Sequence, residues 1–293
     1  MVNDVCGART VSRLKRVSDH KSPYVITVAS GKGGVGKTLT TVNFAVAARR
    51  LGHSVLILDG DLGLANVDVL LGLSARYNVR DVLDGNASLK DVIIEGPMGI
   101  GVIPSGSGIT SLTQLSYVQK TQLFDQIDQL GEGYDLLLID TGAGIADNVV
   151  YFAGCADRLV VVTTPEPHAM TDAYALIKVL AEEHRIKNFE LLVNQARSGD
   201  EGLKVADRIA EVAMRFLNVQ VNFLGHVPYD PQVPKSVMQR RAASEQSTFT
   251  VAGQAWNQLA RRLINDHSAK PASGTQADIW RGLLRDDFKV AAR

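Results

Sequence analysis

Eight consecutive residues carry the strongest chemical signal in this sequence: Gly31 to Thr38 are Gly-Lys-Gly-Gly-Val-Gly-Lys-Thr. Glycines allow a tight turn with positive φ, in which backbone N–H groups converge on an anion. An apolar run, residues 24–29, precedes the turn, and a helical pattern follows it, so a helix N-terminus adds its positive dipole end. The Gly-x-x-x-x-Gly-Lys-Thr spacing therefore predicts a loop that binds nucleotide phosphates.

Two side chains of this loop have direct tasks at a bound nucleotide. Lys37 is suited to neutralise charge on the β- and γ-phosphates, and the Thr38 hydroxyl is a ligand for Mg²⁺. The backbone contacts are expected from Gly31, Lys32, Gly33, Gly34, Val35 and Gly36. A plain glycine-rich turn before a helix is the competing interpretation, and it leaves the complete motif in its strand–turn–helix context unexplained.

Carboxylates follow two other apolar runs. Residues 56–58 lead into Asp59-Gly60-Asp61, and residues 136–139 lead into Asp140. Ligands of open α/β sheets bind at the carboxyl ends of the strands, so these side chains are predicted to lie near the phosphates. An apolar strand that closes on Asp is typical of a carboxylate that binds Mg²⁺ through water. The combination predicts a nucleoside triphosphatase that uses Mg²⁺.

The elements that position these residues are strands alternating with helices. Apolar runs with strand character occupy residues 24–29, 54–58, 100–104, 135–139, 159–163, 189–193 and 219–227, the last interrupted by Gly225. Continuous apolar runs are typical of strands buried on both faces. Helical spacing occupies residues 38–51, 169–183, 201–216 and 251–264. The alternation predicts an α/β fold: a doubly wound, mostly parallel sheet with helices on both faces, the P-loop NTPase class.

Four segments are expected along the chain. They are a basic N-terminal arm (1–22), an ATPase domain (23–267), a flexible linker (268–276) and an amphipathic tail helix (277–293). A helical wheel places Ile279, Trp280, Leu283, Leu284 and Phe288 on one half. Asp287 interrupts this apolar face, where an unpaired buried carboxylate is costly. Membrane contact through residues 277–291, docking on protein and disorder of the tail therefore all stay open.

Net charge, cysteine content and hydrophobic segments limit the kinds of partner and the cellular location that the sequence suggests. The formal net charge is zero, which gives no overall attraction to nucleic acid or acidic membrane. The two cysteines, Cys6 and Cys155, have no metal-ligand spacing and suggest no disulfide framework. No signal peptide or spanning segment is recognisable. We therefore expect a cytoplasmic protein, with peripheral contact at the inner face of the cell membrane as an alternative.

Lys32, directly after the first glycine, makes the loop resemble the deviant Walker A motif of the MinD/ParA superfamily. The resemblance implies an ATP-dependent homodimer in which Lys32 reaches the partner's nucleotide. It implies that Asp61 orients the attacking water and, with Asp59, belongs to the metal's water shell. It also implies adenine contacts from Asn194 and from the turn that holds Pro228 and Asp230. Leu39 stands where the superfamily usually has Thr or Ser.

Residues 61–72 and 171–178 resemble the FlhG (FleN) family of MinD-like ATPases. This resemblance implies a slow, partner-stimulated ATPase that regulates flagellar number and placement. The implied partners are an FlhF-like GTPase, a flagellar C-ring protein or a flagellar transcription activator. Residues 8–15 match the FlhF-activating motif of that family poorly.

Three other functions compete. A MinD-like regulator of the division site would share the same core. A ParA-like DNA segregation ATPase would need a basic patch for phosphate contacts, and the core offers only the pairs at 240–241 and 261–262. A metal-cluster carrier would need paired cysteines, which Cys155 alone does not supply. We therefore expect no specific nucleic-acid partner.

Overall fold

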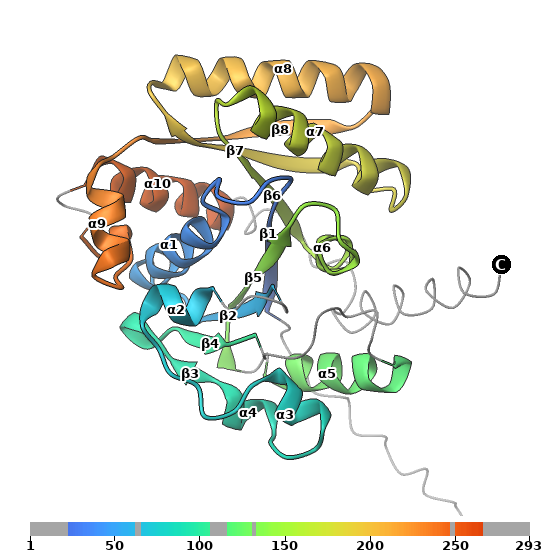
Figure 1. Ribbon diagram of the computed structural model, residues 1–293, viewed down its shortest axis with the longest axis vertical. Coiled ribbons are helices and arrows are strands. Elements are labelled where there is room, and N and C mark those ends of the chain that lie inside the picture. Colours follow the sequence, from blue (N-terminus) through green and yellow to red (C-terminus); the bar gives the residue numbers. More distant parts are fainter. Residues whose placement is uncertain (1–22, 62–65, 106–115, 131–132, 247–249, 266–293) are drawn as a thin grey trace, which may run out of the picture.

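The computed structural model describes residues 23–61, 66–105, 116–130, 133–246 and 250–265. Eight strands of these residues form one sheet in the order β3-β4-β2-β5-β1-β6-β7-β8 (Figure 1). Every neighbouring pair is parallel except β3 and β4. The strands are β1 Tyr24–Ser30, β2 Val55–Gly60, β3 Ile94–Glu95, β4 Gly101–Ile103, β5 Leu136–Ala143, β6 Arg158–Thr163, β7 Asn188–Ala196 and β8 Gln220–Pro228.

Helices cover both faces of the sheet, which confirms the predicted doubly wound architecture. The helices are α1 Lys37–Arg50, α2 Val67–Leu71, α3 Val79–Leu83, α4 Leu89–Val92, α5 Tyr117–Leu130, α6 Asp147–Gly154, α7 Pro167–Glu182, α8 Gly199–Leu217, α9 Gln232–Met238 and α10 Val251–Asn265. On β1, Ile26 and Val28 face the cluster that contains α1 and α10. Val25 and Ala29 face the opposite side, which α3 to α8 cover. Burial on both faces explains the continuous apolar runs in the sequence.

The predicted strand near residue 219 contains a bulge at its glycine. The pairing of β7 with β8 runs Leu191↔Phe223 and then Leu192↔Gly225, so Leu224 is an extra residue. Gly225 has φ +147°, and a Cβ there would lie 2.5 Å from Leu259 Cδ2 of α10. The glycine thus lets α10 pack closely on the bulged strand.

Several elements are absent from the sequence-based prediction. They are the antiparallel strand β3, the short helices α2, α3, α4 and α9, and the longer α5 and α6. The N-terminal arm (1–22), the linker (268–276) and the tail (277–293) lie outside the described residues. No helix within the described part is long and apolar enough to cross a membrane.

Candidate active site

The phosphate loop connects β1 to α1 and turns through two glycines with positive φ. Gly34 has φ +82° and Gly36 has φ +91°, and Gly36 is the residue directly before α1. Gly31 lies against α7, where a Cβ would come within 2.0 Å of the Asp172 carbonyl oxygen. These conformations and contacts require glycine, as the motif predicted.

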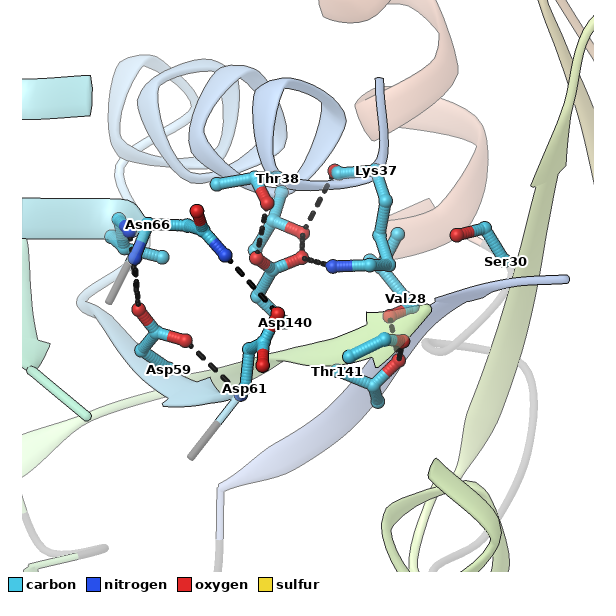
Figure 2. A network of polar contacts seen from close by, with 12 residues as sticks. Val28, Ser30, Lys37, Thr38, Asp59, Asp61, Asn66, Asp140 and Thr141 are labelled. Carbon is cyan, nitrogen blue, oxygen red and sulfur yellow. Dashed lines mark hydrogen bonds and ion pairs between the residues drawn. The ribbon is translucent and has the colours of Figure 1, made fainter. Parts of the chain in front are cut away.

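The Asp140 carboxylate, in the carboxyl-terminal half of the central strand β5, is the centre of the site (Figure 2). Its Oδ1 lies 3.1 Å from Lys37 Nζ and accepts from Thr41 Oγ1 at 3.0 Å. Its Oδ2 accepts from Thr38 Oγ1 at 2.6 Å. Asp140 is fully buried and Lys37 is 8% exposed, so the loop and the predicted metal-binding carboxylate form one desolvated cluster.

Asp59 is the residue opposite Asp140 in the pairing of β2 with β5. It is also fully buried, and it accepts hydrogen bonds from the backbone N–H groups of Asp61, Asn66 and Val67. Burial, and secondarily the charge of Asp140, raises the pKa of Asp59 to about 7. Burial also raises the pKa of Asp140, although the Lys37 charge and three hydrogen bonds oppose the shift.

Asp61 lies at the open side of this pair. Asn66 Nδ2 donates to its Oδ2 at 3.1 Å, and a Cβ on Gly142 would be 3.6 Å from its Oδ1 (Figure 2). The carboxylate is therefore held between the end of β2 and the segment that follows Asp140.

The donor set fits Mg²⁺. Lys37 is paired with Asp140, and the neighbouring Asp59 carboxyl, whose pKa is raised to about 7, can lose its proton to balance the charge of a divalent cation. Within the described residues, no group of three His, Cys, Asp or Glu side chains could hold a metal unaided. The arrangement suits a cation held by Thr38 and phosphate oxygens, with Asp59, Asp61 and Asp140 contributing through water.

Lys32 points away from this cluster. Its Nζ lies 3.2 Å from Glu166 Oε2, next to the start of α7. Both side chains are exposed, Lys32 by 40% and Glu166 by 69%. Lys32 is therefore at the surface of the protein, whereas Lys37 is buried.

Two of the residues expected to contact adenine, Asn194 and Asp230, form hydrogen bonds with other protein groups. Asn194 is 3% exposed, and its Nδ2 donates to the Val35 carbonyl at 2.8 Å. Asp230 accepts from Gln232 N and Ala252 N, so its carboxylate caps two helix starts. Pro228 ends β8, one strand beyond Asn194 in the sheet. The structure brings these residues to the same edge as the phosphate loop.

Three residues of the site were absent from the prediction. Thr41 lies one turn after Lys37 on α1, a helical spacing that could have indicated it. Asn66 contacts Asp59 and Asp61, and Glu166 contacts Lys32; no local sequence pattern indicated these contacts.

A family comparison decides the assignment. Residues 26–242 match the CobQ/CobB/MinD/ParA nucleotide-binding domain. The chain belongs to this family. The curated relatives of this MinD/ParA-family chain include the antiactivator FleN of Pseudomonas aeruginosa, which is 40% identical across 85% of this chain and 89% of FleN. The flagellum site-determining protein YlxH of Helicobacter pylori is 31% identical across 87% and 90% of the two chains.

Solved structures of family members have the same fold. MinD of Pyrococcus horikoshii, in complex with Mg-ADP, matches with a TM-score of 0.68 and 25% identity over 86% of this chain and all of that one. MinD in the MinC:MinD complex of Aquifex aeolicus matches with a TM-score of 0.67 and 27% identity over 86% and 98% of the chains. Fold and motif together identify a MinD/ParA-type ATPase fold, and the sequence is similar to that of FleN.

Proposed function

We propose that this protein binds and hydrolyses MgATP and that ATP switches it between monomer and homodimer. The buried cluster of Lys37, Thr38 and Asp140 is the observation that carries the proposal. It joins the phosphate loop to a metal-suited carboxylate, and hydrolysis needs little beyond charge neutralisation and a positioned water.

Each residue of the cluster has a separate task in this proposal. Loop N–H groups and Lys37 bind the phosphates, Thr38 holds the metal, and Asp59 and Asp140 hold its water shell. Mg²⁺ supplies neutralisation of charge between the β- and γ-phosphates. Asp61 orients the attacking water, and Lys32 acts on the nucleotide of the partner subunit.

We propose that the switch regulates flagellar number or placement. The support is the 40% identity to FleN and the 31% identity to YlxH, a flagellum site-determining protein. Because FleN is named an antiactivator, a flagellar transcription activator is the first partner to test. An FlhF-like GTPase and a flagellar C-ring protein are the other candidates.

A MinD-like role at the division site is the second candidate, since the septum site-determining MinD relatives reach 35% identity. A role in DNA segregation has less support. Arg241 is paired with Glu245, and Arg262 donates to the Leu224 carbonyl, so the two predicted basic pairs are partly engaged in the fold.

Complementation separates the flagellar proposal from the division proposal. The chain would be expressed in Pseudomonas aeruginosa lacking FleN, and flagella per cell would be counted. We expect the wild-type chain to restore the normal number and Asp61→Ala to fail. Normal restoration by Asp61→Ala would contradict a role that depends on hydrolysis.

We also propose that residues 277–291 contact membranes. This contact would depend on ATP, because the ATP-dependent dimer presents two tails to the membrane. Vesicles containing anionic lipid should retain the protein weakly with ATP and lose it when residues 277–293 are deleted. Asp287→Leu should strengthen retention. Weaker or unchanged retention of that variant would favour docking of the tail on protein.

A further inference from the structure

The Asn194 side chain makes two hydrogen bonds, one to the phosphate loop and one to the next residue of its own strand. It lies near the carboxyl end of β7, and its side chain is 3% exposed. Nδ2 donates to Val35 O at 2.8 Å, and Oδ1 accepts from the N–H of Gln195 at 3.0 Å. Gln195 itself has φ +57°, so the second bond stabilises the turn that aims the amide.

The neighbouring glycine shows how closely the amide is packed on the loop. A Cβ on Gly36 would lie 2.3 Å from Asn194 Nδ2. Gly36 also has φ +91°, so both its conformation and the space beside it exclude a larger residue. The Asn194 amide is therefore in direct contact with the peptide that joins Val35 to Gly36.

The orientation of that peptide matters for phosphate binding. In a planar trans peptide the C=O and the following N–H point in opposite directions. A bond that holds the Val35 carbonyl toward β7 therefore directs the Gly36 N–H away from β7. Gly36 immediately precedes α1, where the N–H groups of the loop converge.

We infer that Asn194 is a positioning residue for the phosphates, because its amide fixes the Val35–Gly36 peptide with the Gly36 N–H directed into the anion site. This inference rests on the proposed nucleotide binding. It gives Asn194 a task independent of the base: the side chain pre-orders a phosphate donor before any nucleotide arrives. Loss of the amide would leave a buried carbonyl without its donor and the peptide free to rotate.

Tripolyphosphate with Mg²⁺ tests the inference, because this probe has phosphates and no base. Binding of Mg²⁺-tripolyphosphate and of MgATP would be measured by calorimetry for the wild type and for Asn194→Ala. We expect the variant to lose affinity for tripolyphosphate about 10-fold, the scale of one buried hydrogen bond left unmade. Any additional loss seen only with ATP would measure a contact to adenine. Unchanged tripolyphosphate affinity would overturn the inference.

Asn43 provides a matched control. It is also fully buried, and its amide donates to Leu39 O at 2.7 Å while its carbonyl accepts from Ser244 N at 2.7 Å. Asn43→Ala should lower thermal stability by a similar amount and keep tripolyphosphate affinity at the wild-type value. An equal loss of affinity in both variants would show general destabilisation and overturn the assignment.

A second variant and a hydrogen-exchange measurement complete the test. Asn194→Ser, whose hydroxyl is too short to reach the Val35 carbonyl, replaces the alanine variant if that variant does not fold. Hydrogen exchange across residues 31–38 without nucleotide should accelerate in either Asn194 variant and not in Asn43→Ala. A wild-type chain that binds neither probe would overturn the proposed function itself, whereas wild-type binding with an unaffected variant overturns only the role of Asn194.

Discussion

The two lysines of the phosphate loop form ion pairs in opposite environments. Lys37 and Asp140 are 8% and 0% exposed, whereas Lys32 and Glu166 are 40% and 69% exposed. Removal of one partner from a buried pair leaves an uncompensated charge, and an exposed pair is screened by water.

We predict that Lys37→Ala lowers the free energy of unfolding of the nucleotide-free protein by roughly 3–5 kcal/mol near pH 8. The loss should shrink at acidic pH, because Asp140 has a raised pKa and can take up a proton. Glu166→Gln, the exposed counterpart, should change stability by less than about 1 kcal/mol. Urea unfolding at two pH values measures both; equal losses for the two variants would contradict this difference in burial.

Asp59 makes stability depend on pH. The pKa is raised from 3.8 to about 7, chiefly by burial. Between these values the folded protein retains a proton that the unfolded chain has lost, so rising pH favours unfolding. The contribution of Asp59 to stability is thus largest below about pH 4 and fully lost above about pH 7.

We predict that the unfolding free energy of the wild type, relative to Asp59→Asn, falls between about pH 4 and pH 7 by up to about 1.4 kcal/mol per pH unit. The Asn side chain does not titrate, so the difference reports the proton of Asp59 together with its coupling to Asp140. Urea unfolding without nucleotide or Mg²⁺ is the measurement. A difference that stays constant across this range would show that Asp59 has an ordinary pKa in the folded protein.

Motifs predicted the residues that lie in contiguous segments of the site. Gly31 to Thr38, Asp59 and Asp140 each stand directly beside a strand with a clear apolar pattern. The partner of Asn194 was not predictable, because Val35 is 159 residues away in sequence and the contact depends on strand order. Glu166 likewise meets Lys32 only because β6 lies beside β1.

At the scale of elements, α7 is packed directly against the start of the phosphate loop. A Cβ on Gly31 would lie 2.0 Å from the Asp172 carbonyl oxygen, which is backbone and cannot turn aside. Gly33, in the same loop, has nothing within 4 Å of the corresponding position and has no positive φ. The two glycines therefore provide a matched pair.

We predict that Gly31→Ala lowers the unfolding free energy by about 1–3 kcal/mol, the cost of an overpacked contact, because α7 and the loop must separate. Gly33→Ala should leave it nearly unchanged. Thermal unfolding without nucleotide compares the two variants. If Gly33→Ala were the more destabilised, the contact between the loop and α7 would not be the determining feature.

Length explains why the shortest of the missed elements were not predictable, although α5, with 14 residues, was missed as well. Strands β1, β5 and β7 and helices α1, α7 and α8 are long enough to show an apolar run or a helical period. Helices α2, α3 and α4 have five residues or fewer, and β3 has two, so periodicity cannot appear in them. Their folding depends on the packing of the β2–β5 region against the rest of the sheet.

At the scale of the whole molecule, strand order gathers the site at one edge. The four central strands β2, β5, β1 and β6 are neighbours, and their carboxyl ends supply Asp59, Asp140, the phosphate loop and the segment with Glu166. These residues come from positions between Gly31 and Glu166, a span of nearly half of the chain. The exposed Lys32 lies at this same edge. It is on the surface and is not in contact with Asp59 or Asp140 of its own chain.

This placement leads to a prediction about assembly. Within one chain, Lys37 is the lysine paired with Asp140, and Lys32 is exposed at the surface. We therefore expect Lys32 to act on the nucleotide of a second copy of the chain. Lys32→Ala should therefore bind MgATP with near wild-type affinity and remain monomeric. Asp61→Ala should bind MgATP, fail to hydrolyse it and accumulate as dimer, because water positioning is lost while the phosphate loop is intact.

Lys178→Ala, which removes an exposed lysine from α7, is the control and should behave as wild type. Size-exclusion chromatography with light scattering, in ATP and in ADP, distinguishes these states. A Lys32→Ala dimer as stable as that of the wild type would contradict the role of Lys32 across the interface, and normal turnover by Asp61→Ala would contradict the role of Asp61.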